Sequence, residues 1–146
     1  MSVAVAATEA DRQACYALRF EVFVDEQGVT PETEIDAEDA TATHLLLRRD
    51  GVALGTLRIL HDGADARIGR VCVRKSARGS GLGAELMRAA LRVIADGPRV
   101  DKIRLSAQLS VVGFYRTLGF AAYGPVYDDE RIPHQAMERP MELQAR

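Results

Sequence analysis

Three glycines lie within five residues of one another, at Gly79, Gly81 and Gly83, and a cluster of cations precedes them. The cations are Arg70, Arg74, Lys75 and Arg78. An apolar alternation comes before the glycines and a helical pattern follows them, which predicts a strand, a turn and a helix. The first N–H groups of a helix lack intrahelical acceptors, and glycine lets the backbone approach a ligand closely. The segment therefore predicts an anion site, with phosphate as the typical ligand.

Three known phosphate loops can be compared with this segment. The P-loop requires a Lys followed by Ser or Thr after its last glycine, and none follows here. The dinucleotide fingerprint GxGxxG ends on Ala84 when it is started at Gly79, a permitted variant. It belongs in a βαβ unit, however, whereas this strand ends an antiparallel meander. The pattern [Q/R]xxGx[G/A] fits residues 78–83, "RGSGLG", at every fixed position, and it is the pyrophosphate loop of acyl-CoA transferases.

With this loop the chain resembles the GNAT superfamily of N-acetyltransferases. The segment "GRVCVRKSARGSGLGAELM" is similar to the strand, loop and helix of that family's acetyl-CoA motif, and "FYRTLGF" at 114–120 is similar to its C-terminal signature. The segments "LRFEVFVDEQGV", "EIDAEDATATHLLL" and "IPHQAM" resemble the ElaA-like branch of small bacterial members. The resemblance covers nearly the whole chain. It implies transfer of an acetyl group from acetyl-CoA to a primary amine of a small molecule or peptide, by direct attack and without a metal.

The resemblance also implies roles for individual residues. It assigns acetyl-CoA contacts to Val71, Cys72, Val73, Arg78, Gly79, Ser80, Gly81, Leu82, Gly83, Ala84 and Gln108, with the backbone of the first three holding the pantetheine arm. Tyr115 stands at the position of the family's general acid, and a phenol with a pKa of ~10 suits a thiolate leaving group. The alternative is that Tyr115 is a core aromatic residue, like Phe114 and Phe120. Many members have Asn after the fifth strand, where this chain offers Gln108 or Ser110.

The acceptor amine must lose a proton, because an amine with a pKa near ~10 is almost fully protonated at neutral pH. Four side chains are candidates for the base: Glu34, Asp36, His44 and His134. Residues 21–40 carry eight carboxylates and no Lys or Arg, which predicts attraction of a cationic acceptor. The alternative for that segment is a solvated acidic loop.

Bulk composition sets the broad class. The chain has 146 residues, 47% of them hydrophobic and 27% charged, which predicts a single domain over 1–146. A net charge of −2 argues against a nucleic-acid partner, and no apolar run approaches the ~20 residues of a membrane span. The N-terminus lacks the basic region of a signal peptide. Cys15 and Cys72 form no CxxC pair, which argues against a zinc site or disulfide framework and favours buried thiols in the cytoplasm. We expect a monomer or homodimer.

Local patterns predict the elements that position these residues. Thr8 predicts the start of a helix over 9–23, Asp50-Gly51 a type I′ hairpin turn, and Gly119 the end of a short helix. The predicted strands are 2–6, 43–49, 52–60, 66–73, 102–107, 120–126 and 134–142. Further helices are predicted from the glycine loop to about 96 and over 111–118, and 25–41 and 127–133 are predicted to be irregular. The order and the resemblance together give an α/β (α+β) fold, a three-layer α-β-α sandwich with a mixed, mostly antiparallel central sheet.

Two other functions are compatible with the sequence. Acyl-homoserine-lactone synthases share a related fold and an early pattern echoed by Arg19, Val22, Phe23, Glu34, Asp36 and Asp39. They are usually longer and lack the RxxGxG loop. A non-catalytic acyl-CoA sensor is the other alternative, and it would not need Tyr115. A thioester-cleavage assay with a panel of amines separates these classes.

Overall fold

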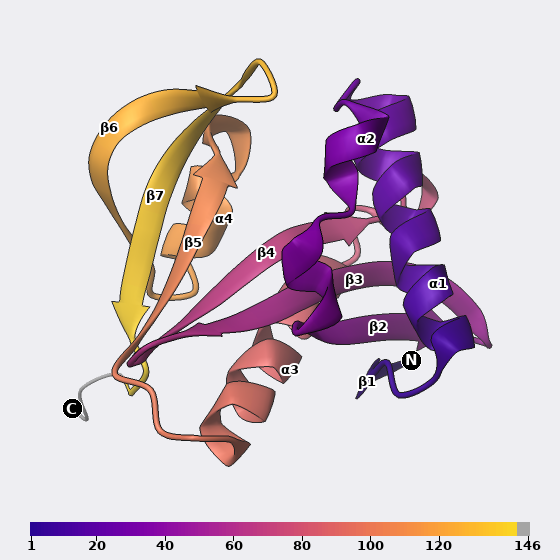
Figure 1. Ribbon diagram of the computed structural model, residues 1–146, viewed down its shortest axis with the longest axis horizontal. Helices are drawn as coiled ribbons and strands as arrows, with labels where there is room; N and C mark the ends of the chain where they lie inside the picture. Colours follow the sequence, from indigo (N-terminus) through magenta and orange to yellow (C-terminus); the bar gives the residue numbers. More distant parts are fainter. Residues whose placement is uncertain (143–146) are drawn as a thin grey trace. The chain divides into compact units, whose positions relative to one another are not determined.

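The computed structural model describes residues 1–142, and its chain divides into two compact units (Figure 1). The first unit comprises Met1–Leu60 and Ile68–Val93, and the second comprises His61–Arg67 and the chain from Ile94 onward. The first unit therefore holds the glycine loop, and the second holds Tyr115 and His134.

The strands of the first unit are β1 (Ser2–Val5), β2 (Thr43–Arg49), β3 (Val52–Asp62) and β4 (Asp65–Val73), in the order β1-β2-β3-β4. The ends of β3 and β4 that flank the turn between them belong to the second unit. Strand β2 pairs antiparallel with both β1 and β3. Asp50 and Gly51 have φ of 53° and 77°, as a type I′ turn requires, so the predicted hairpin is confirmed.

Helices lie on both faces of this sheet. Helix α1 (Glu9–Arg19) buries Cys15 and Leu18 in a cluster that includes Leu46 of β2. Helix α3 (Leu82–Asp96) packs against the other face, where a Cβ on Gly55 of β3 would lie 2.8 Å from Leu86 Cδ1. Successive residues of a strand point to opposite faces, and Gly55 pairs with Leu47, the neighbour of Leu46. The first unit therefore has the predicted helix–sheet–helix layering.

Helix α1 begins as predicted but does not end where the pattern suggested. Thr8 is its N-cap, and the Thr8 hydroxyl accepts a hydrogen bond from the Asp11 N–H at 3.1 Å. The chain then continues as a π-helical segment, Phe20–Glu26, past the predicted end at residue 23. The prediction of irregular chain over 25–41 is wrong in part, because α2 (Pro31–Glu34) and a 3₁₀ turn (Ala37–Ala40) form there.

The second unit contains β5 (Lys102–Gln108), α4 (Val112–Arg116), β6 (Ala121–Asp129) and β7 (Ile132–Pro140). Its strands run in the order β5-β7-β6, with antiparallel pairing throughout. Residues 127–129, 132 and 133 lie in strands, so the predicted long turn is wrong. The turn is Glu130-Arg131, with φ of 50° and 65°. Gly119, with φ of 91°, follows α4 as predicted.

Candidate active site

The glycine loop joins β4 to α3 through a short 3₁₀ turn, Lys75–Ala77. Gly79 and Gly81 have φ of 86° and 82°, the left-handed region that favours glycine. A Cβ at either position would meet no atom within 4 Å, so backbone conformation rather than crowding accounts for these two glycines. The loop is exposed, and α3 begins at Leu82. Free N–H groups at the start of a fifteen-residue helix therefore follow an exposed left-handed turn, as an anion site requires.

The side chain of Arg78 is held by protein acceptors. Its Nε donates to the Val73 carbonyl at 2.9 Å, and its two terminal nitrogens donate to the Glu26 carboxylate at 2.6 and 2.7 Å. The hydrogen bond from Arg78 lowers the pKa of Glu26 below its usual range, even though Glu26 is exposed. The neighbouring cation Arg74 pairs with Glu21 at 3.0 Å. Two of the four cations that precede the glycines therefore form ion pairs with the π-helical segment.

The end of β4 offers backbone groups rather than a reactive side chain. Cys72 is buried in the cluster beneath α1, and burial raises the pKa of its thiol to about 12. Burial also raises the pKa of Cys15. Both cysteines are therefore buried protonated thiols, as predicted. Any contact of residues 71–73 with a pantetheine arm would use the main chain.

The acidic segment, residues 21–40, is not a free negative surface. The sequence showed its eight carboxylates without neighbouring cations and predicted that they attract a cationic acceptor, but most of them are paired in the structure. Six of its eight carboxylates form ion pairs with arginines from other parts of the first unit. These six are Glu21, Glu26, Glu34, Asp36, Glu38 and Asp39. Within the described chain, Asp25 and Glu32 have no ion pair. Most of the negative charge of residues 21–40 is therefore neutralised by arginines that are distant in the sequence.

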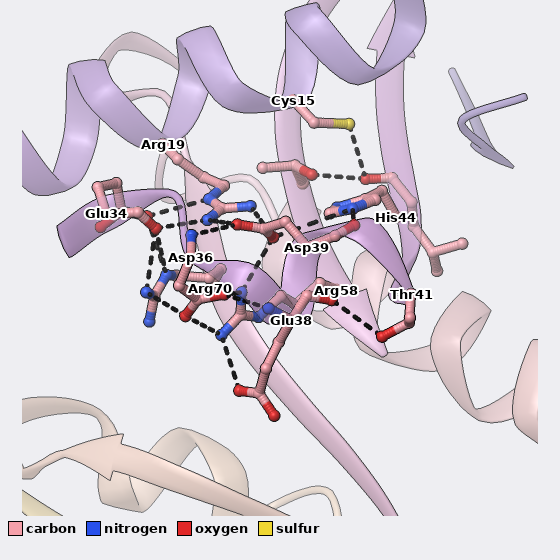
Figure 2. A network of polar contacts seen from close by, with 12 residues as sticks. Cys15, Arg19, Glu34, Asp36, Glu38, Asp39, Thr41, His44, Arg58 and Arg70 are labelled. Carbon is pink, nitrogen blue, oxygen red and sulfur yellow. Dashed lines mark hydrogen bonds and ion pairs between the residues drawn. The ribbon is translucent and has the colours of Figure 1, made fainter. Parts of the chain in front are cut away.

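The innermost of these pairs form the network shown in Figure 2. Arg19, only 1% exposed, donates from Nε to Glu34 Oε2 at 3.0 Å and from both terminal nitrogens to Asp39 at 2.8 and 3.0 Å. Arg58 of β3 bridges Asp39 and Asp36 through Nη1, at 2.9 and 2.8 Å. Burial alone would raise the pKa of Asp39, but the hydrogen bonds from Arg19, the Asp36 N–H and Arg58 hold it well below its usual range.

Three of the four candidate bases belong to this network. Glu34 has a buried side chain whose Oε2 is shared by Arg19 and Arg70. Burial raises its pKa against the attraction of both guanidinium groups, but protonating it would disrupt two ion pairs. The hydrogen bond from Arg58 lowers the pKa of Asp36, which makes it a weaker base. His44 is 3% exposed, and its Nε2 lies 3.0 Å from the Asp39 carbonyl. None of the three offers an accessible free lone pair to an incoming amine.

The fourth candidate, His134 on β7, has different surroundings. Its Nδ1 lies 2.7 Å from the Ile132 carbonyl, which can only accept, so the neutral ring carries its proton on Nδ1. Its ring stacks on Tyr127 of β6 with a centroid distance of 6.0 Å. The side chain is partly exposed, and no described residue hydrogen-bonds its Nε2. The register places His134 opposite Gln108, so the structure brings these two predicted residues together. The sequence predicted His134 as one of four candidate bases but did not reveal its tautomer or its partners.

Tyr115 lies in an aromatic cluster of the second unit. Its ring is 7% exposed and packs edge-on against Phe114 and Phe120, with centroid distances of 5.0 and 6.1 Å. The ring therefore contributes to packing, as the alternative interpretation proposed. Packing of the ring leaves the role of its hydroxyl as a prediction. Ser110, the other substitute for the family's Asn, lies in the 3₁₀ turn Leu109–Val111.

The family model of the acetyltransferase (GNAT) domain matches residues 5–141 of this chain. This chain belongs to the GNAT acetyltransferase family. A UPF0039 protein of Mycobacterium tuberculosis is 38% identical over 144 residues, which cover 92% of this chain and 89% of that relative. The predictions of family and enzyme class are confirmed.

Solved structures confirm the fold of this GNAT member. An acyl-CoA N-acyltransferase from Pseudomonas aeruginosa matches with a TM-score of 0.84 and 36% identity over 94% of this chain and 97% of that one. Escherichia coli ElaA matches with a TM-score of 0.84 and 28% identity over 94% and 98%. The fold is thus the GNAT acyl-CoA N-acyltransferase fold with a mixed seven-stranded sheet. The acyl-homoserine-lactone synthase LasI matches at 20% identity with a TM-score of 0.77 over 97% and 90%, which shows a shared fold alone.

Residues 1–142 contain no group of three or more His, Cys, Asp or Glu side chains arranged to hold a metal ion. In the same residues, every helix is too short or too polar to cross a bilayer.

Proposed function

We propose that this GNAT-family acyltransferase moves the acetyl group of acetyl-CoA to a primary amine of a small molecule or peptide. The observation that carries the proposal is the exposed 78–83 loop, whose left-handed Gly79 and Gly81 precede α3. The N–H groups of the loop and of the first turn of α3 bind the pyrophosphate, through Arg78, Gly79, Ser80, Gly81, Leu82, Gly83 and Ala84. The backbone of Val71, Cys72 and Val73 binds the pantetheine arm, and Gln108 hydrogen-bonds CoA.

The proposed chemistry is direct attack of the amine on the thioester carbonyl. His134 accepts one proton from the ammonium at Nε2, because Nδ1 already donates to the Ile132 carbonyl. The neutral amine forms the C–N bond, the C–S bond breaks, and its electron pair goes to sulfur. Tyr115 gives a proton to the thiolate and is reprotonated by the second proton of the attacking nitrogen. The proton on His134 passes to solvent, so one proton is released per turnover.

The acceptor is proposed to be an amine that is cationic before it reacts. Asp25 and Glu32 are the described carboxylates of the acidic segment that have no ion pair, and these two support the proposal because they can attract a cation. The net charge of −2 supports the absence of a nucleic-acid partner. We also propose that residues 1–146 act as one cytoplasmic domain, without a metal or membrane partner, as a monomer or homodimer.

A thiol-release assay with acetyl-CoA and a panel of amines tests this function. The expected result is amine-dependent release of CoA and an acetylated product in mass spectra. The loop variant Gly81→Glu is the control, because a carboxylate and a Cβ at a left-handed position would oppose pyrophosphate binding. Binding of acetyl-CoA without transfer to any amine would favour a sensor. Unchanged acetyl-CoA affinity in folded Gly81→Glu would contradict the loop assignment. Transfer from a longer acyl-CoA to S-adenosylmethionine, with lactone formation, would favour a homoserine-lactone synthase.

A further inference from the structure

Strand β4 contains a residue with unusual backbone geometry. Arg70 has φ of 54°, although it lies inside the strand and directly before residues 71–73. The described chain has three other non-glycine residues with positive φ, Asp50, Glu130 and Arg131, and all three lie in two-residue hairpin turns. A left-handed backbone is unfavourable for any residue with a Cβ. Such a conformation persists only where surrounding contacts impose it.

The side chain of Arg70 makes contacts that can impose it. Its Nε and Nη2 donate to the Glu34 carbonyl at 3.2 and 3.0 Å, and Nε lies 2.9 Å from Glu34 Oε2. Nη2 also reaches the Thr33 carbonyl at 3.4 Å and Asp36 Oδ2 at 3.3 Å. Figure 2 shows the guanidinium of Arg70 directed at Glu34 and Asp36. The side chain therefore joins β4 to the end of α2 through both backbone and carboxylate acceptors.

The other end of this connection is itself fixed. Glu34 is 2% exposed, and Arg19 donates to its carbonyl at 2.7 Å as well as to its carboxylate at 3.0 Å. Arg19 belongs to α1 and is held in turn by Asp39. The chain of contacts from Arg19 through Glu34 to Arg70 thus connects the buried face of α1 to one residue of β4.

We infer that Arg70 is a positioning residue for acyl transfer, whose contacts with Glu34 hold the left-handed backbone that directs residues 71–73. This inference rests on the proposed function, in which the backbone of residues 71–73 binds pantetheine. If φ of residue 70 returned to the strand value of about −120°, the N–H and C=O groups after it would be redirected. A misplacement of ~1 Å at a reacting group can cost ~10²-fold in rate. Arg70 itself touches no reacting atom in this account.

Kinetics of Arg70→Ala, Arg70→Gly and Arg70→Lys test the inference. In Arg70→Ala, kcat should fall by at least about tenfold, while the dissociation constant for CoA changes far less because the glycine loop is intact. Arg70→Gly should retain more kcat than Arg70→Ala, because glycine adopts positive φ without a steric cost. Arg67→Ala, in the same strand with an ion pair to Asp62 at 3.7 Å, is the matched control and should keep its kcat.

The order of the variants distinguishes positioning from simple stabilisation. If the ion pair only stabilises the fold, its loss in Arg70→Ala should lower the melting temperature and leave kcat unchanged. Alternatively, kcat would fall equally in Arg70→Gly and Arg70→Ala. Either result overturns the inference while wild-type transfer still supports the proposed function. If Arg70→Ala does not fold, the comparison of Arg70→Gly with Arg70→Lys decides, and a glycine variant at least as active as the lysine variant is expected. Wild-type protein that binds CoA but transfers to no amine refutes the proposed function, and the inference with it.

Discussion

Replacing Asp39 with Asn tests the buried network directly. Asp39 accepts four hydrogen bonds: two from Arg19 at 2.8 and 3.0 Å, one from Arg58 at 2.9 Å and one from the Asp36 N–H at 3.0 Å. The asparagine has one acceptor oxygen, and its NH₂ would face cationic donors. Removing one partner of a buried ion pair costs ~3–5 kcal/mol. For a chain of this size, each kcal/mol lowers the melting temperature by ~2–4 °C, so we expect a decrease of roughly 6–20 °C.

The assay is thermal and urea unfolding followed by circular dichroism, with Asp25→Asn as the control. Asp25 lies in the same acidic segment, is exposed and has no ion pair in the described chain, so its variant should unfold like the wild type. The reasoning is refuted if Asp39→Asn loses less than about 1 kcal/mol, because the network would then add little to ordinary surface pairing.

The stability difference between wild type and Asp39→Asn should depend on pH, and the lowered pKa of Asp39 fixes the direction of this dependence. Hydrogen bonds hold the pKa of folded Asp39 below the value of ~3.9 of an unfolded aspartate. Its contribution to stability is therefore fully present above about pH 4 and is lost as the pH falls toward the folded pKa. The stability difference between wild type and Asp39→Asn should be constant near neutral pH and should narrow below about pH 4. A difference that widens in acid would contradict this assignment.

Three further predictions concern the proposed chemistry. Tyr115→Phe should keep the melting temperature but lose at least about tenfold in kcat, within the ~10²–10⁴-fold range of general-acid catalysis; full kcat would leave Tyr115 as a core aromatic residue. His134→Asn keeps a donor for the Ile132 carbonyl but removes the base, so kcat should fall most for strongly basic amines; an equal loss for weakly basic amines, or the same loss in exposed His61→Asn, would contradict the role. Glu26→Gln removes a negative charge beside the loop and should increase acetyl-CoA affinity in calorimetry, an effect that should shrink with added salt. Unchanged affinity at low salt would show that the charge of Glu26 does not repel the pyrophosphate.

Elements governed by local rules were predictable from the sequence. The Asp50-Gly51 hairpin, the Thr8 cap and the loop before α3 all depend on residues within a few positions of one another. The turn at Glu130-Arg131 was not predictable in this way, because neither residue type favours positive φ. The π-helical segment was also missed. Its carboxylates pair with Arg74 and Arg78, more than fifty residues further along the chain, and no local pattern contains those partners.

Partners that are distant in sequence also explain why the acidic segment was wrongly predicted to carry unbalanced negative charge. The sequence shows eight carboxylates without a neighbouring cation, but Arg58 and Arg70 reach them from β3 and β4. A usable signal was present, because five cations and no acid occupy residues 67–78, and opposite runs of this kind can pair in a fold. For the base, residue types gave four candidates of equal standing. Burial and hydrogen bonding separate them, and both depend on tertiary structure.

The contacts of Arg78 explain why the loop pattern accepts either Arg or Gln at this position. If a positive charge on the phosphate were required, glutamine would fail, because it is neutral. In this structure the Nε of Arg78 donates to the Val73 carbonyl at 2.9 Å, and an amide N–H of glutamine can make the same kind of bond. We therefore expect both residue types to tie the loop to the end of β4. In the proposed function, the charge that attracts the pyrophosphate would then come from the oriented N–H groups after Arg78 and from the dipole of α3.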